Sequence, residues 1–175
     1  MKLLLTGPPG VGKTTLVKRI VVKLRGTFSC SGFITEEVRG PDGDRVGFDI
    51  VTLDGRVAPL SRKARTGGPR VGDYRVDLPS LETVGVPAMT QRGADLVVVD
   101  EIGLMEIASP LFREELLRLL DGDGHMLATI RRVREPFCDA VKARPDVEMV
   151  EVDQRNRDAL VEMLAVRLID AVIPQ

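Results

Sequence analysis

The sequence predicts an α/β domain: a three-layer sandwich whose mostly parallel sheet is extended by an antiparallel β meander. Apolar runs of strand length alternate with amphipathic helical patterns, which is typical of a parallel sheet. A glycine-rich turn joins the first strand to the first helix, and strand-like runs with turn signals interrupt the alternation at about 28–78. Because 175 residues suit one domain, we expect a single domain over 1–175.

The composition excludes several classes of protein. With 43% apolar and 29% charged residues, the chain is neither disordered nor collagen-like. Its apolar runs are too short to span a bilayer, and three apolar residues before the glycine-rich turn are too few for a signal peptide. The net charge of −1 gives no signal for nucleic acid or an anionic membrane. Two cysteines, Cys30 and Cys138, favour the reducing cytoplasm, and a monomer is favoured.

The first strand and the first helix follow directly from the pattern. Residues 2–6 (KLLLT) form a continuous apolar run before a turn of glycine and proline. Residues 13–25 are predicted to be a helix because Leu16, Val17, Ile20, Val21 and Leu24 recur at helical spacing.

The segment at about 28–78 predicts the antiparallel meander. Turn signals at 41–44 (PDGD) and at Asp54-Gly55 separate short runs with strand character. The expected strands are GFITEEVR at 32–39, RVGFDIVTL at 45–53, RVAPL at 56–60 and RVGDYRVDL at 70–78. Between the last two, a basic, glycine-rich stretch at 61–70 is expected to be a mobile loop.

The α/β alternation then resumes to the end of the chain. Ser109 followed by Pro110 is a typical helix start, because Ser caps the free N–H groups and Pro suits the first turn. We expect helices at about 79–92, from 110, at 136–144 and at 156–172, and strands at 96–100, 125–130 and 148–152.

The segment GPPGVGKT at 7–14 matches G-x-x-x-x-G-K-[ST] at every fixed position, between a strand and a helix. A polyphosphate needs many converging N–H donors, which a glycine-rich loop before a helix N-terminus supplies. The pattern predicts a phosphate-binding loop (P-loop), with Lys13 between the β- and γ-phosphates and Thr14 on Mg²⁺. The expected nucleotide-binding residues here are Gly7, Pro8, Pro9, Gly10, Val11, Gly12, Lys13, Thr14 and Thr15.

The run LVVVDE at 96–101 predicts the second half of the site. A buried strand that ends in an acid is typical of the strand that carries the Mg²⁺-linked aspartate of P-loop proteins. Asp100 is therefore expected to bind nucleotide-linked Mg²⁺ through water, and Glu101 to activate the attacking water. A structural salt bridge is the alternative role for Glu101.

Polar residues at the end of the next strand are weaker candidates. If that strand lies between the first strand and the Asp100 strand, Thr129 reaches the γ-phosphate or the attacking water; otherwise it caps a strand end. One of Arg131, Arg132 and Arg134 is a candidate catalytic arginine, with a solvated basic loop as the alternative. The single histidine, His125, begins a strand, so packing or a surface position is the simpler interpretation.

The chain resembles the cancer-related, or thermophilic, nucleoside-triphosphatase family of small P-loop proteins. The resemblance covers nearly the whole length. Its most specific part is the pair GF-x-TEEVR and DEIG-x-ME, in this order and spacing. It rests on TGPPGVGKTTL at 6–16, GFITEEVR at 32–39, GFDIVTLDG at 47–55, PLSR at 59–62, VGDYRVDL at 71–78, DEIGLMEI at 100–107 and NRDAL at 156–160.

This resemblance implies slow, Mg²⁺-dependent hydrolysis of ATP, GTP, CTP and UTP to the diphosphate and phosphate, with little base preference. It places the family's phosphate loop on Gly7 to Thr14 and its acidic strand end on Asp100 and Glu101. The family often has Lys where this chain has Leu104, so that residue's role is not carried over. The segment RRVREP after Thr129 is more basic than the resemblance leads us to expect. The resemblance therefore does not identify which of its arginines is catalytic.

Two other functions use the same loop. A nucleotide or nucleoside kinase needs a cationic acceptor pocket, which Arg39, Arg62, Arg65 and Arg70 are candidates to supply. A nucleotide-dependent switch would bind a partner protein, but a guanine-reading [NT]-K-x-D motif is absent. The base is expected to rest on residues 153–157 (DQRNR), and Asn156 and Arg157 are the residues expected to contact it.

Overall fold

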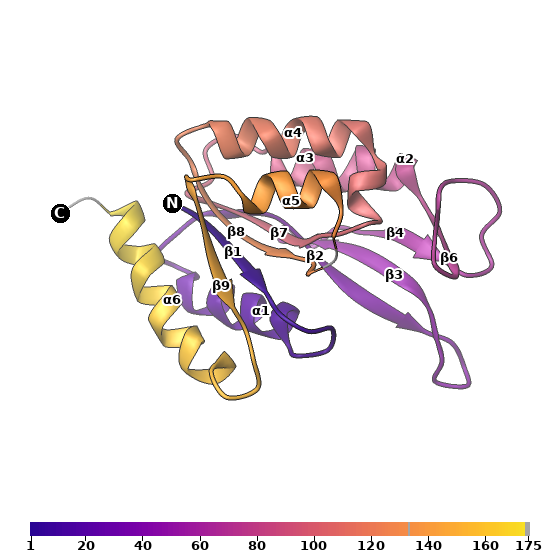
Figure 1. The fold of residues 1–175 in the computed structure, drawn as a ribbon, viewed down its shortest axis with the longest axis horizontal. Helices are drawn as coiled ribbons and strands as arrows, with labels where there is room; N and C mark the ends of the chain where they lie inside the picture. The colour runs from indigo at the N-terminus through magenta and orange to yellow at the C-terminus, as the bar shows by residue number, and fades with distance from the viewer. Residues whose placement is uncertain (133, 174–175) are drawn as a thin grey trace.

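The computed structural model describes residues 1–132 and 134–173. It shows a sheet covered by helices on both faces, as the ribbon of Figure 1 makes plain. The sheet has nine strands among these residues, in the order β5-β6-β4-β3-β2-β7-β8-β1-β9. The predicted fold class, a mostly parallel α/β sandwich with an antiparallel extension, is confirmed.

Five strands form the parallel half of the sheet. They are β1 (Lys2–Thr6), β2 (Cys30–Arg39), β7 (Leu96–Ile102), β8 (His125–Ile130) and β9 (Val147–Glu151). Strand β8 pairs with β1 on one side and β7 on the other, as the Thr129 hypothesis required. Because these strands are parallel, the carboxyl ends of β1, β8 and β7 lie side by side at one edge of the sheet. These ends are Thr6, Ile130 and Ile102.

The antiparallel extension consists of β3 (Arg45–Thr52), β4 (Val57–Arg62), β5 (Arg70–Val71) and β6 (Tyr74–Val76). Strand β2 joins the two halves, since it pairs parallel with β7 and antiparallel with β3. The prediction of one strand over 70–78 was wrong. A turn at Gly72, where φ is 59°, divides it into the hairpin of β5 and β6.

Helices α1 (Lys13–Leu24) and α6 (Arg157–Val172) cover one face of the sheet. The other face carries α4 (Pro110–Asp121), α5 (Pro136–Lys142) and a run of α2 (Leu78–Ser80), η1 (Leu81–Gly85) and α3 (Val86–Met89). No described helix is long and apolar enough to cross a membrane.

The helix predicted over 79–92 is shorter and irregular. It begins at Leu78, where Asp77 caps the N–H of Ser80 at 3.1 Å, and it ends at Met89. A π-helical turn, η1, occupies its middle. Pro87 lies within it and lacks the N–H that a regular helix uses. Ser109 caps α4 as predicted, by accepting the N–H of Phe112 at 3.1 Å.

Two apolar cores lie on the two faces of the sheet. Leu3, Leu5 and Val98 point toward α1 and α6, whereas Leu4, Val97 and Val99 point toward the helices of the other face. Neighbouring residues alternate because a strand turns successive side chains to opposite faces. Burial on both faces explains why these strands are continuously apolar, so polar residues are expected at the strand ends.

Candidate active site

A cavity of about 760 Å³ lies at the carboxyl edge of the parallel strands. The P-loop and the start of α1 form one wall, and the ends of β7 and β8 form another. Residues of β2, β3 and β4 close the side toward the antiparallel extension. Loops and strand ends from distant parts of the sequence thus meet at one site, as is common in open α/β sheets.

The P-loop has the backbone that its glycines permit. Gly10 and Gly12 have φ of 75° and 102°, which other residues rarely adopt. Gly7 is packed so closely that an added Cβ would stand 2.3 Å from the carbonyl oxygen of Val152. Gly12 is the N-cap of α1 and offers no side-chain cap, so the first N–H groups of this helix are directed at the cavity.

The P-loop residues do not all face the cavity. Those that line it are Gly7, Pro9, Gly10, Gly12, Lys13, Thr14 and Thr15. Pro8 is exposed outside the lining, and Val11 is buried in the core beneath. The Lys13 ammonium donates to the carbonyl oxygens of Gly7 and Pro8 at 3.2 and 3.4 Å. Its charge is thus held within the loop.

Asp100 lies at the carboxyl edge of β7 and is only 1% exposed. Its Oδ1 accepts the hydroxyl of Thr129 at 2.6 Å, whereas Oδ2 is buried and has no hydrogen-bond partner among the described residues. Burial raises the pKa of Asp100, and the hydroxyls of Thr129 and Thr14 oppose this shift. The Asp100 carboxylate, with its unpartnered Oδ2, and the nearby Thr14 hydroxyl are oxygen donors of the kind that suits Mg²⁺.

Glu101 follows Asp100 through a cis peptide bond and lines the cavity. Burial raises its pKa, while the positive charges of Lys13 and Arg131 act in the opposite direction. Within the described residues Glu101 forms no ion pair. The salt-bridge alternative therefore has no partner there, and Glu101 is a lining residue of the cavity.

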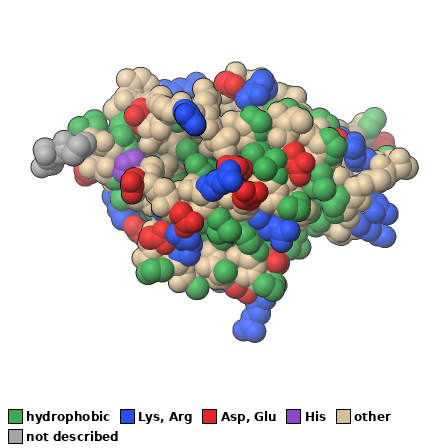
Figure 2. All heavy atoms as spheres, turned by 90° about the horizontal axis from the view of Figure 1, so that it is seen from above, with side chains coloured by type: hydrophobic (Ala, Val, Ile, Leu, Met, Phe, Trp, Pro, Cys, Tyr) green, Lys and Arg blue, Asp and Glu red, His purple; other side chains and the backbone are tan. Residues whose placement is uncertain are grey.

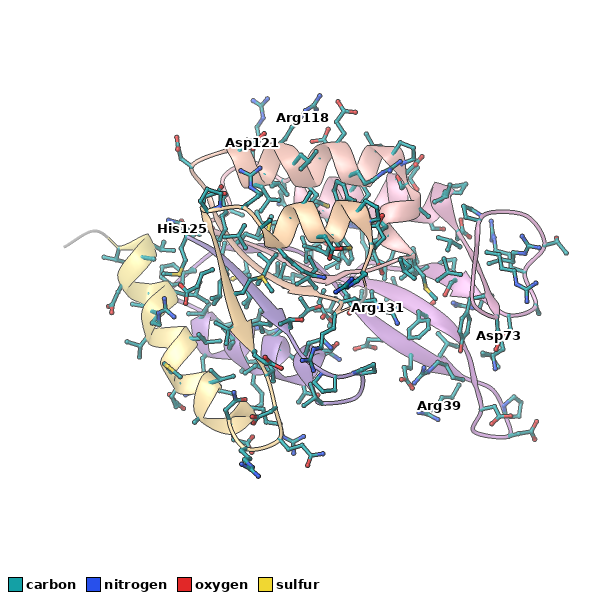
Figure 3. All side chains as sticks on the ribbon, in the orientation of Figure 1. Arg39, Asp73, Arg118, Asp121, His125 and Arg131 are labelled. Atoms are coloured by element: carbon teal, nitrogen blue, oxygen red, sulfur yellow. The ribbon has the colours of Figure 1, made fainter. Side chains whose placement is uncertain are left out.

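The three arginines after β8 differ in position. Arg131 and Arg132 line the cavity, whereas Arg134 is exposed outside it. Arg132 pairs with Glu151 at 3.0 Å, while Arg131 lies beside the end of β7, near the centre of the view in Figure 3. Of the three, Arg131 is therefore the best-placed candidate for contact with a γ-phosphate.

The residues expected to hold the base stand apart from the cavity. Asn156 serves the turn after β9: its Oδ1 accepts the N–H of Asp153 at 2.9 Å, and its Nδ2 donates to the carbonyl of Glu151 at 2.8 Å. Arg157 donates to the carbonyl oxygen of Val11 at 3.3 Å, so it contacts the P-loop. Their role as base contacts stays a prediction.

The arginines proposed for a kinase acceptor pocket lie at the end of β2 and in the antiparallel extension, and they are engaged elsewhere. Arg39, Arg62 and Arg65 pair with acids of the extension or next to it. Arg70 donates to the carbonyl of Gly72 at 2.9 Å. The lining of the cavity, as described, includes none of these four. Figure 2 shows the blue side chains of this region gathered at the right-hand end of the molecule.

His125 has a structural contact, as expected. Its Nδ1 lies 3.0 Å from the amino group of Met1, and Figure 3 places it far from Arg131. The only lining residue of the cavity with an aromatic ring is Phe48, as far as the chain is described.

Several residues of the site were not predicted. Thr35, Phe48 and Met105 line the cavity, and Glu106 is a buried acid in its wall. Glu106 belongs to the DEIG-x-ME segment, so a signal for it was present in the sequence. The others come from the neighbouring strands and the turn after β7, and only the fold brings them to the cavity.

The comparisons with known proteins agree with this geometry. A family model described as NTPase matches residues 2–165. Nucleoside-triphosphatase THEP1 of Thermotoga sp. (strain RQ2) is 43% identical over 169 residues, covering 95% of each chain. The cancer-related nucleoside-triphosphatase homolog of Bos taurus is 39% identical over 172 residues, covering 89% of this chain and 90% of its own.

Two solved structures have the same fold. The crystal structure of THEP1 from Aquifex aeolicus has a TM-score of 0.87 at 35% identity and covers 96% of this chain and 99% of its own. The solution structure of a human cancer-related nucleoside triphosphatase has a TM-score of 0.81 at 36% identity, covering 95% and 96%. The resemblance seen in the sequence is thereby confirmed, and the chain belongs to this NTPase family of P-loop nucleoside-triphosphatases.

Proposed function

We propose that this protein hydrolyses nucleoside triphosphates to the diphosphate and phosphate, with Mg²⁺ bound to the phosphates. The observation that carries the proposal is the convergence of two features on one cavity. The P-loop offers N–H groups and Lys13, and the end of β7 offers Asp100 and Glu101 across from them. The names of the relatives support the same activity.

Each group has a task in this proposal. The N–H groups at the start of α1 and the Lys13 ammonium bind the β- and γ-phosphate oxygens, for which Lys13 leaves its contacts with the loop carbonyls. Thr14 and the free Oδ2 of Asp100 would hold Mg²⁺ directly or through water. Bound there, the ion would neutralise charge on the phosphates.

Glu101 performs the proton transfer. A water molecule attacks the γ-phosphorus and loses a proton to the Glu101 carboxylate, while the bond to the β-phosphate oxygen breaks and the diphosphate leaves. Burial raises the pKa of Glu101, which makes its carboxylate a stronger base than an exposed one. Arg131, at the same wall of the cavity, would offset the negative charge of the transition state.

The proposal includes broad base tolerance and a cytoplasmic location. All the groups named above act on phosphate and metal, which every nucleoside triphosphate shares. Asn156 and Arg157 are not among the residues that line the cavity, and stacking of a base on Arg155 or Arg157 would give affinity without choice among bases. We expect kcat/KM values for ATP, GTP, CTP and UTP within about tenfold of each other, which is about 1.4 kcal/mol of discrimination.

The proposed cytoplasmic location rests on the two cysteines. The free thiols of Cys30 and Cys138 suit a reducing compartment.

A phosphate-release assay tests the proposal. It compares the four triphosphates with Mg²⁺ and with excess chelator, and repeats each with nucleosides added as acceptors. We expect free phosphate only with Mg²⁺ and no phosphorylated acceptor. Activity that survives the chelator excludes the metal role, and a new phosphorylated nucleoside identifies a kinase instead. A hundredfold preference for one base would reveal a specific base pocket.

A further inference from the structure

Glu106 is a buried acid in the wall of the cavity, and the proposed hydrolysis does not use it. It begins η2 (Glu106–Ala108), a single 3-10 turn, and is 4% exposed. Burial and the neighbouring charge of Glu101 raise its pKa to about 8, and Asp100 adds to the shift. Its carboxyl group is therefore mostly neutral at pH 7 and does not compete with Glu101 for negative charge.

The carboxyl group of Glu106 closes the turn after β7, which comprises residues 103–105. Its Oε2 accepts the N–H of Gly103 at 3.2 Å, and both groups are buried. A buried N–H without a partner costs about 1–3 kcal/mol, so this bond favours one conformation of the turn. Gly103 comes only two residues after Glu101, and the turn therefore continues directly from the base.

Three functional side chains meet at Gly103. A Cβ added there would lie 3.0 Å from Oε2 of Glu106, 3.4 Å from Oε2 of Glu101 and 3.2 Å from Cδ of Arg131. These distances are tighter than ordinary van der Waals contacts, so a side chain at residue 103 would displace these groups by a few tenths of an ångström. The side chains of Glu106, Glu101 and Arg131 thus all lie close to one backbone position, on the side to which a Cβ of residue 103 would point.

We propose that Glu106 is a positioning residue for hydrolysis: through Gly103 it fixes the turn after β7 and directs the Glu101 carboxylate at the attacking water. The inference rests on the proposed function, because it takes Glu101 as the base. Glu106 acts through the backbone and touches neither water nor phosphate in this role.

Two variants of Glu106 separate this role from simple packing. Glu106→Gln keeps the shape and an acceptor oxygen, so kcat should stay within about fivefold of the wild type. Glu106→Leu fills similar space without an acceptor, so kcat should fall about 10- to 100-fold, toward the loss of a general base. KM for ATP should change less than threefold in both, because the P-loop is untouched.

A double variant tests whether Glu106 acts through Glu101. In the Glu101→Gln background, adding Glu106→Leu should lower kcat less than twofold further, because residues that act as a unit are not additive. Asp77→Asn is the matched control, since Asp77 is an equally buried acid that caps α2 away from the cavity. It should lower stability but leave kcat unchanged.

Gly103→Ala provides a second route if Glu106→Leu does not fold. The added methyl group should lower kcat about tenfold while KM stays constant. Normal kcat in a folded Glu106→Leu or Gly103→Ala protein overturns the inference, and so does a Glu106→Gln protein as slow as Glu106→Leu. If Glu101→Gln itself is fully active, the proposed function fails; if Glu101→Gln is slow and Glu106→Leu is not, only this inference fails.

Discussion

The parallel half of the sheet and the antiparallel extension use charged residues in opposite ways. In the parallel half, three acids near the carboxyl edge are buried or half-buried and form no ion pair within the described residues: Asp100, Glu101 and Glu106. In the extension, charges are paired: Arg62 with Asp49, and Arg65 with Asp77. A buried acid without an ion-pair partner is costly to ionise, so such acids are kept where a ligand or a reaction needs them.

The two halves of the sheet contribute differently to the cavity. The parallel half carries the groups that would bind phosphate and move a proton, whereas the extension supplies part of the cavity wall through Phe48 and Leu60. Both halves belong to one domain in the sequence prediction, and β2 pairs with both. Substitutions in the parallel half should therefore change turnover, and substitutions in the extension should change stability.

The largest effect is expected for Lys13→Ala. This change removes the ammonium from the P-loop, and we expect at least about a 1000-fold loss of turnover, as for a strong electrostatic contact to the transition state. Phosphate release measures it, and circular dichroism shows whether the fold is intact. Normal turnover in a folded Lys13→Ala protein would contradict the assignment of the P-loop as the phosphate site.

Glu101→Gln should have the next largest effect. The amide keeps the shape of the carboxylate but cannot take a proton from water, so hydrolysis should fall by roughly 10²–10⁴-fold. Binding of Mg²⁺ and nucleotide, followed with a fluorescent ATP analogue, should persist. If hydrolysis stays within about threefold of the wild type, positioning and charge stabilisation account for the rate better than a general base does.

The difference between the halves also explains how much could be predicted from sequence. The P-loop and the strand that ends in Asp100 could be predicted because local patterns encode them. The P-loop has fixed glycines at a turn, and the strand is a buried apolar run followed by an acid. Thr129 was predicted only through an assumed strand order, which the sheet has. Glu106 was missed although it belongs to the DEIG-x-ME segment, because its burial and its bond to the N–H of Gly103 depend on how the turn after β7 folds back.

The extension was harder to predict because its boundaries depend on tertiary pairing. The run at 70–78 alternates like one strand, yet Gly72 and Asp73 form a turn that lets β5 pair with β6. The helix predicted over 79–92 likewise breaks into short segments where it packs against the sheet. Propensity is a weak guide where packing decides the ends of an element.

Glu106 also predicts a pH dependence of stability. Its pKa is about 8 in the folded protein against 4.5 ordinarily, so between these values the folded state keeps a proton that the unfolded chain loses. Stability should therefore fall as pH rises through this window, by at most about 1.4 kcal/mol per pH unit. Glu106→Gln lacks this ionisation, so its stability should fall less.

Urea unfolding at pH 5.5 and 7.5 measures the effect. Between these two conditions the wild type should lose about 2.5 kcal/mol more than Glu106→Gln. Asp100 and Glu101, whose pKa values are also raised, are present in both proteins, so their contribution largely cancels. Equal losses in the two proteins would mean that Glu106 is already charged in the fold at neutral pH.

The smallest effect on turnover is expected in the antiparallel extension, where Arg65→Ala tests its separation from the chemistry. Arg65 pairs at 2.5 Å with Asp77, whose side chain is 7% exposed, so the change leaves a buried carboxylate without its cation. Since Arg65 is itself 35% exposed, the loss of stability should be about 1–2 kcal/mol, between the values for surface and buried pairs. Turnover should stay within twofold. Arg70→Ala is the matched control. Arg70 is exposed and donates to the nearby carbonyl of Gly72, with no ion pair among the residues that the structure describes, so stability should change by less than about 0.5 kcal/mol. A tenfold loss of turnover in Arg65→Ala, with stability unchanged, would instead bring the extension into the reaction, as a kinase requires.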